Sequence, residues 1–191
     1  MTIHDLIAYN VKNKFSKARM IYRKMIDPLM VRNSTFITTV SECSKRDIIK
    51  FCNAKENKIA VIPNATDRNR FKEYDADAVD SCLKKFDLVR KGYLLFVGTI
   101  DYPGKNIMSA IEGYERLREK HNIKDKLVIV GKDGFNAQVI YDYVNHSKFK
   151  DDIIFTGYIS DEDLPLLYSG AKVMIYLSLY EGFGLPVLEA M

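Results

Sequence analysis

The sequence predicts an α/β protein built on a parallel, doubly wound sheet of the Rossmann type. From residue 93 onward, short apolar runs alternate with segments whose apolar residues recur at helical spacing. The first three of these runs end at or near a glycine. Strands that alternate with helices at this spacing form βαβ units, and such units build a parallel sheet.

The second half contains the regular part of the pattern. Its expected elements are strand 93–97, helix 106–120, strand 127–130, helix 136–146, strand 153–155, helix 160–168 and strand 173–177. Ser160 and Asp163 have the spacing of a capping box, which marks a helix start. Pro186 suits the first position of a closing helix, which would place Glu189 in its first turn.

The first half is less regular. Residues 35–40 and 59–62 are expected to be strands, and Ser44 with Asp47 is expected to cap a helix running to Phe51. Residues 67–75 are polar and show no periodicity, which is typical of a crossing between domains. A helix over about residues 76–86 is expected to open the second domain.

The 191 residues are therefore expected to form parts of two domains, 1–66 and 67–191. Doubly wound sheets usually carry about six strands. The second part has four expected strands, and the two in the first part are too few for an independent sheet. The pattern predicts an interior piece of a larger two-domain protein, with an incomplete second domain.

Composition narrows the class of protein. Hydrophobic residues make up 47% of the chain and charged residues 28%, as in soluble globular proteins. A net charge of +4, without basic clusters interleaved with aromatics, indicates no nucleic-acid partner. Cys43, Cys52 and Cys82 form no CxxC pair, which argues for a reducing compartment and against a zinc site. With no visible leader or spanning segment, we expect a cytoplasmic protein.

Four glycine-bearing loops follow the expected strands. They are residues 98–105, 131–134, 157–158 and 180–184. The carboxyl ends of parallel strands meet at one edge of a sheet, where ligands bind. A single glycine often does no more than end a strand, but four in register favour a ligand cleft with close approach to the backbone.

Charged residues in these loops suggest the chemistry of the ligand. Lys105 stands at a helix start, where a phosphate oxygen is a natural partner, although a solvated surface lysine fits its position equally well. Glu181 and Glu189 are placed to flank one ligand, and carboxylates accept hydrogen bonds from the vicinal diol of a sugar. Alternatively, Glu189 only complements a helix N-terminus, an effect of ~0.3–1 kcal/mol.

The chain resembles the retaining glycosyltransferases of family 4, which have two facing Rossmann-like domains in the GT-B architecture. Residues 181–189 resemble the E-x7-E motif of that family, and residues 96–106 resemble its first donor-phosphate loop. Residues 155–168 resemble the stretch that holds the nucleotide base. Residues 39–45 and 61–65 resemble the end of the N-terminal domain. The resemblance makes residues 1–66 the tail of the acceptor-side domain and residues 67–191 the nucleotide-sugar-binding domain.

The resemblance implies a role for each matching residue. Lys105 would neutralise the donor diphosphate, Glu189 would hold the ribose diol, and Glu181 would hold the transferred sugar. His4, in a short motif that is also similar, would lie on the acceptor side near the reacting centre. The other implied donor contacts are Gly98, Gly131, Tyr158, Ile159, Gly182, Phe183 and Gly184. No metal or cofactor is implied, because the nucleotide sugar is a co-substrate.

The expected activity is transfer of a sugar from a UDP- or GDP-sugar to a glycan or lipid-linked acceptor in surface polysaccharide biosynthesis. Relatives often carry an arginine in the first loop, where this chain has Thr99 or Gly104. That departure favours an alternative, a truncated nucleotide-sugar-binding module without turnover. An oxidoreductase ranks low, because no G-x-G-x-x-G follows the first strand of the regular half.

Residues 12–32 form a basic stretch with apolar residues at helical spacing. The apolar residues are Phe15, Ala18, Tyr22, Met25, Ile26 and Leu29. The favoured interpretation is a domain helix with this apolar stripe in the core and its charges in water. The alternative is a helix that lies on an anionic membrane surface, which suits an enzyme with a lipid-linked acceptor at the inner face of the membrane.

Overall fold

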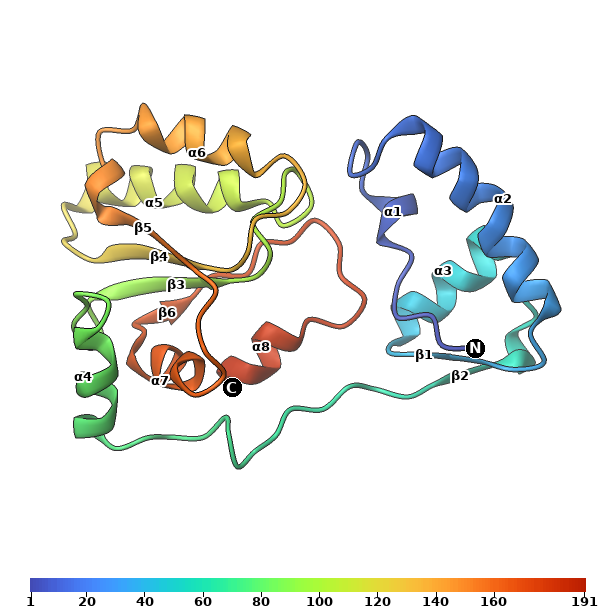
Figure 1. The fold of residues 1–191 in the computed structure, drawn as a ribbon, viewed down its shortest axis with the longest axis horizontal. Helices are drawn as coiled ribbons and strands as arrows, with labels where there is room; N and C mark the ends of the chain where they lie inside the picture. Colours follow the sequence, from blue (N-terminus) through green and yellow to red (C-terminus); the bar gives the residue numbers. More distant parts are fainter. The chain divides into compact units, whose positions relative to one another are not determined.

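The computed structural model describes residues 1–191, and the chain divides into two compact units. The smaller unit consists of residues 1–65 together with residues 179–185. The larger unit consists of residues 66–178 together with residues 186–191. Figure 1 follows the chain through both units. The predicted domain limits, 1–66 and 67–191, stay a prediction. The two compact units are defined by contacts within this chain alone, so they do not test those limits.

The larger unit is an α/β sandwich around a parallel sheet. Its elements are α4 (Ala76–Lys84), β3 (Tyr93–Val97), α5 (Ile107–His121), β4 (Lys126–Val130), α6 (Ala137–Asn145), η2 (Lys150–Asp152), β5 (Ile153–Gly157), α7 (Asp163–Gly170) and β6 (Val173–Met174). The strands lie in the order β5-β4-β3-β6, and every neighbouring pair is parallel. The predicted fold class is confirmed.

Helices cover both faces of this sheet (Figure 1). Successive residues of a strand point to opposite faces. Phe96 and Ile129 accordingly pack with residues of α5 and α6, whereas Leu95 and Val128 pack with residues of α4 and α7. Two separate hydrophobic cores result, one on each side of the sheet, as in a doubly wound fold.

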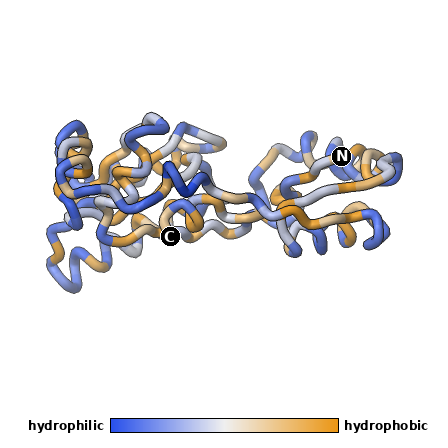
Figure 2. Tube along the Cα trace, turned by 90° about the horizontal axis from the view of Figure 1, so that it is seen from below, coloured by the Kyte–Doolittle hydropathy of each residue, from blue (hydrophilic) through white to orange (hydrophobic).

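The smaller unit has a two-stranded parallel sheet with helices packed on it. Its elements are α1 (Ile7–Asn10), α2 (Lys17–Asn33), β1 (Ile37–Thr39), α3 (Glu42–Cys52), η1 (Glu56–Lys58) and β2 (Ile59–Val61). Thr2 forms an isolated parallel bridge with Thr38 beside the sheet. The core residues are Leu6, Val31, Ile37, Ile48, Cys52 and Ile59. Figure 2 shows apolar stretches alternating with polar ones along both units.

The predicted cap of α3 is wrong. The helix begins at Glu42, and Ser41 is its N-cap, with its side chain accepting from the backbone N–H of Ser44 at 3.0 Å. Ser41 has the extended backbone that an N-cap residue needs. Ser44 is instead buried inside the first turn, where its Oγ donates to the carbonyl oxygen of His4 at 3.0 Å.

Two details at the carboxyl end also differ from the prediction. Strand β6 is only two residues long, because after Ile175, whose N–H donates to Leu95, the chain makes no further ladder contact with β3. Helix α8 (Leu185–Ala190) begins before Pro186 and has no acidic residue in its first turn. The interpretation of Glu189 as a complement to the helix N-terminus is therefore wrong.

The favoured interpretation of the basic stretch, a stripe packed in a core, stays a prediction, because the stripe is only partly covered within this chain. On α2, the side chains of Tyr22, Met25 and Leu29 are 63%, 64% and 52% exposed. The helix packs through its other side, where Val31 is buried and Asp27 accepts hydrogen bonds from Tyr9 and Arg23. Phe15 and Ile26 of the predicted stripe are half-buried, so only part of the stripe is exposed.

A close approach of two strand ends determines the shape of the sheet edge. Gly131 follows β4, and a Cβ atom at this position would lie 1.9 Å from the carbonyl oxygen of Gly98, which follows β3. Real Cβ atoms do not come this close to a backbone oxygen. Only glycine therefore lets the loops after these two neighbouring strands pack together.

Replacing Gly131 with alanine is expected to destabilise the protein by about 1–3 kcal/mol, because the two loops must separate. Chemical denaturation measures the change. Gly113→Ala is the matched control, since no atom lies within 4 Å of the added Cβ inside α5. That control should be neutral or stabilising by up to about 1 kcal/mol. Equal stability of the two variants would contradict the account of the edge.

Candidate functional site

The loops after β3, β4 and β5 meet at the carboxyl edge of the sheet, where the sequence predicts a ligand. The N–H of Gly98 donates to Val130 at 2.9 Å, and the N–H of Gly131 donates to Gly157 at 3.0 Å. These bonds extend the sheet ladder by one residue beyond the strands. Gly98, Gly131 and Gly157 thus line one edge without side chains, which leaves their backbone open to a ligand.

Lys105 lies beside this edge. A Cβ atom on Gly98 would be 3.8 Å from Cε of Lys105, so the lysine stem passes close to the first glycine. The loop before it is fixed by Asp101, a buried residue whose Oδ1 accepts from the backbone N–H of Lys105 at 2.8 Å. The structure therefore places Cε of the half-buried Lys105 next to Gly98, two residues before α5.

Tyr158 and Ile159, expected near the base, follow β5 at the same edge. The side chain of Ile159 is buried in the core, so only its backbone is available to a ligand. The ring of Tyr158 is exposed, and Nζ of Lys132 lies 4.6 Å from its centroid. Lys132 is a second cation at this edge that the sequence analysis did not single out. The one feature of the sequence that could have indicated Lys132 is its position directly after Gly131.

Glu189 is held by a tyrosine. Its Oε2 accepts a hydrogen bond of 2.9 Å from the hydroxyl of Tyr168 in α7. Burial, followed by the charge of Glu189, raises the pKa of Tyr168 well above its usual range. The phenol therefore stays protonated and donates. Tyr168 was missed in the sequence analysis because it is 21 residues from its partner and reads as an ordinary helix residue.

Glu181 lies in the loop of residues 179–185, which belongs to the smaller unit. The next residue, Gly182, is buried against the segment that carries His4. A Cβ atom on Gly182 would be 2.9 Å from the carbonyl oxygen of His4 and 2.9 Å from Cβ of Asp5. The backbones around the two predicted catalytic residues, His4 and Glu181, are therefore close neighbours within this unit.

The predicted site residues fall into two groups. Gly98, Gly131, Lys105, Tyr158 and Ile159 gather at the sheet edge of the larger unit, and Glu189 is tied to α7 of the same unit. The smaller unit carries the remaining residues, which are His4, Glu181, Gly182, Phe183 and Gly184. Gly184 has a positive φ of 97° that glycine adopts readily. The roles of all these residues stay predictions.

Two further features of the chain concern metals and membranes. No group of three or more His, Cys, Asp or Glu side chains is arranged so that it would hold a metal ion. None of the helices has both the length and the apolar character required to cross a bilayer. The chemistry available at the described sites is that of lysine ammonium groups, backbone amides and carboxylates.

The class of protein follows from this fold and from a family match. The sequence matches the family of glycosyl transferases group 1 over residues 83–191, more than half of the chain. The chain therefore belongs to this family, and the resemblance stated from the motifs is confirmed.

Two curated relatives are O-antigen chain mannosyltransferases. The chain is 32% identical over 190 residues to O-antigen chain mannosyltransferase B of Escherichia coli. It is 28% identical over 191 residues to O-antigen chain mannosyltransferase RfbU of Salmonella typhimurium. Both alignments cover 100% of this chain, but only 49% and 48% of those proteins. The chain thus spans about half the length of these relatives.

Solved structures share the fold. Anabaena Alr3699/HepE, determined in complex with UDP and glucose, aligns with a TM-score of 0.80 over 99% of this chain and 49% of its own. WaaG, a glycosyltransferase involved in lipopolysaccharide biosynthesis, aligns with a TM-score of 0.74 over 97% of this chain and 51% of its own. Both are 16% identical to this chain, so they show the fold alone. That fold is the predicted Rossmann-like GT-B arrangement.

Lys105→Ala in the full-length protein is expected to weaken binding of UDP or GDP about tenfold to a hundredfold, because a charge-assisted hydrogen bond to phosphate is lost. Isothermal titration calorimetry measures the affinity. Lys120→Ala, near the other end of α5, removes the same charge and should leave the affinity unchanged. Equal affinities of Lys105→Ala and the wild type would remove Lys105 from the donor site.

Proposed function

We propose that the chain is part of a retaining hexosyltransferase that moves a sugar from a UDP- or GDP-sugar to a glycan or lipid-linked acceptor in surface polysaccharide biosynthesis. The observation that carries the proposal is the segment 181–189. Its first glutamate lies in a loop packed beside His4, and its second is held by a tyrosine next to a sheet with a glycine-lined edge. Membership of the family and the O-antigen mannosyltransferases among the relatives support it.

Each proposed role follows from the chemistry of the group. Lys105 neutralises the diphosphate, whose departure from the sugar leaves negative charge on a phosphate oxygen. Glu189 accepts hydrogen bonds from the ribose diol, while Tyr168 occupies one of its oxygens. Glu181 accepts from hydroxyls of the transferred sugar, and the amides of residues 182–184 face the sugar and phosphate.

No metal or cofactor is required in this proposal. The leaving diphosphate is stabilised by the ammonium group of Lys105 and by backbone N–H groups at the glycine edge. Relatives often carry an arginine in the first loop that this chain lacks. Lys132, the second cation at that edge, takes over its role of binding phosphate in this proposal. His4 borders the acceptor side, because its segment packs against Gly182.

A nucleotide-sugar-binding module without turnover is the alternative. Such a module also needs Lys105 and the glycine edge but gains nothing from a carboxylate held beside the segment of His4. Release of nucleoside diphosphate from UDP-glucose or GDP-mannose by the full-length protein favours the transferase. Binding of either compound without release would favour the module.

We also propose that the protein contacts a membrane through residues 12–32, at the cytoplasmic face. The exposed residues Ala18, Tyr22, Met25 and Leu29 lie three or four positions apart, so they form one apolar stripe along α2. A helix that lies in the interface of a bilayer has such a stripe with basic residues beside it. The same helix carries the exposed basic residues Lys17, Arg19, Lys24 and Arg32.

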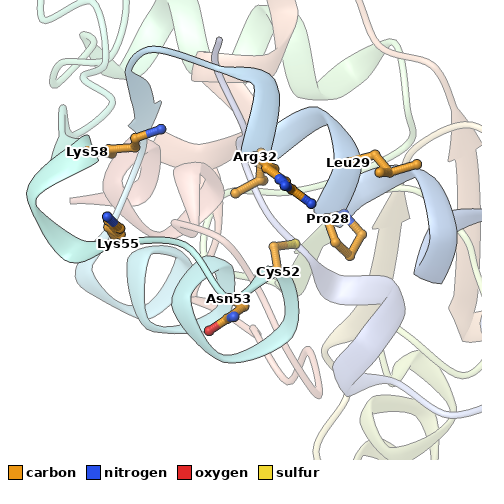
Figure 3. Close-up of a pocket in the computed structure, with 8 residues that line it drawn as sticks. Pro28, Leu29, Arg32, Cys52, Asn53, Lys55 and Lys58 are labelled. Carbon is orange, nitrogen blue, oxygen red and sulfur yellow. The ribbon is translucent and has the colours of Figure 1, made fainter.

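Charge complementarity supports an anionic bilayer as the partner of this face. A cavity of about 370 Å³ lies beside the carboxyl half of α2, between Leu29 and Arg32 on one side and Lys55 and Lys58 on the other (Figure 3). The acid of α2, Asp27, is already paired with Arg23. Each lysine or arginine near an anionic surface contributes about 1 kcal/mol to binding, in addition to the burial of the apolar stripe.

Replacing Glu181 with glutamine in the full-length protein is expected to lower kcat for nucleoside diphosphate release more than about tenfold, because an acceptor for the sugar hydroxyls loses its charge. Glu73→Gln, an exposed change on the connecting segment, is the control and should keep wild-type rates. NMR of the product should show the anomeric configuration of the donor. An inverted product would overturn the retaining mechanism.

The double change Met25→Ser with Leu29→Ser is expected to reduce co-sedimentation with vesicles of phosphatidylcholine and phosphatidylglycerol by more than about tenfold. Val89→Ser, which alters an exposed apolar residue of the larger unit, should bind like the wild type. Absence of wild-type binding to these vesicles would contradict membrane contact. A large loss of thermal stability in the double variant would also contradict it, because the stripe would then be covered by the rest of the longer protein.

A further inference from the structure

The loop of residues 179–185 is fastened to the smaller unit at two points on either side of Glu181. One is the backbone of Gly182, buried against His4 and Asp5, with its carbonyl 3.5 Å from Oγ of Ser44. The other is the side chain of Tyr180, which reaches helix α3. Glu181 is the single residue between these two points.

The side chain of Tyr180 ends in a compact polar cluster. Its hydroxyl donates to the carboxylate of Asp47, and the thiol of Cys43 lies 3.1 Å from the same hydroxyl. Asn10, at the end of α1, donates its side-chain N–H to Oδ2 of Asp47. The loop is therefore linked through one buried carboxylate to both α1 and α3.

This cluster resists opening for physical reasons. Asp47 is buried, and a buried carboxylate that loses a hydrogen-bond donor costs about 1–3 kcal/mol or more. Burial, followed by the hydrogen bond to Asp47, raises the pKa of Tyr180 well above its usual range. The phenol therefore stays protonated and remains a donor to Asp47.

Neither Tyr180 nor Asp47 belongs to the residues given a role in the proposed site. Tyr180 precedes the E-x7-E segment, and Asp47 and Cys43 lie 133 and 137 residues before Tyr180 in the chain. Yet the contact acts on the residue next to Glu181. A shift of the Tyr180 backbone moves the neighbouring carboxylate with it, because the two Cα atoms are joined by one rigid peptide unit.

We propose that Tyr180 and Asp47 are positioning residues, which hold the Glu181 loop on helix α3 so that the Glu181 carboxylate keeps its place beside the segment of His4. The proposal rests on the proposed function, in which Glu181 contacts the transferred sugar. A misplacement of about 1 Å costs up to about a hundredfold in rate. The link therefore affects turnover more than binding of the nucleotide, because the proposed nucleotide contacts, Lys105, Glu189 and the glycine edge, lie in the larger unit.

Tyr180→Phe in the full-length protein tests the proposal, because it removes only the hydroxyl. It is expected to lower kcat for nucleoside diphosphate release from UDP-glucose or GDP-mannose at least about tenfold, while KM changes less than about threefold. Amide hydrogen exchange in residues 179–185 should become faster. Tyr143→Phe is the matched control, since its hydroxyl donates to Glu115 at 2.8 Å in the larger unit. It should change neither measurement.

A second pair of variants separates positioning from loss of folding. Asp47→Asn keeps an oxygen that accepts from Tyr180 and should retain most of kcat, whereas Asp47→Ala should match Tyr180→Phe. Wild-type kcat in Tyr180→Phe, or exchange unchanged in residues 179–185, would overturn the proposal. An equal fall of kcat in Tyr143→Phe and Tyr180→Phe would also overturn it. Failure of the wild type itself to release nucleoside diphosphate would instead contradict the proposed function.

Discussion

The close packing of strand ends at the carboxyl edge of the parallel sheet is the constraint on which the proposed donor site depends. Parallel pairing in register brings the ends of β3, β4 and β5 to one edge, and glycines after each strand keep that edge free of side chains. The backbone of Gly131 fits against the carbonyl group of Gly98 only because Gly131 has no Cβ atom. Lys105 and Lys132 then supply positive charge beside the half-buried backbone of these glycines, which suits an anionic ligand.

Residues 181–189 belong to two separate compact units. Glu181 lies in a loop fastened to α3 and to the segment of His4, whereas Glu189 is tied to Tyr168 in α7 of the larger unit. Helix α8 begins between the two glutamates. Each carboxylate is thus oriented by its own surroundings. The two glutamates of the motif do not form one local structure, because each is held by a different compact unit.

Local periodicity made most of the fold predictable. Every strand and helix expected from residue 93 onward is present, because apolar runs and helical spacing are properties of neighbouring residues. The glycine edge followed from the general geometry of parallel sheets. The hydrogen bonds of Tyr168 and Tyr180 were not predictable, because their partners are distant in sequence and a tyrosine near a helix or strand end carries no specific signal. The stripe on α2 was visible in the sequence, but spacing does not tell whether an apolar face is covered.

The most direct test of the central claim is a crystal structure of the full-length protein with a bound UDP- or GDP-sugar. We expect the diphosphate to lie at the glycine edge with an oxygen within hydrogen-bond distance of Lys105. Glu189 should accept from the ribose, and Glu181 should contact the sugar. A nucleotide bound away from this edge, or a sugar out of reach of Glu181, would contradict it.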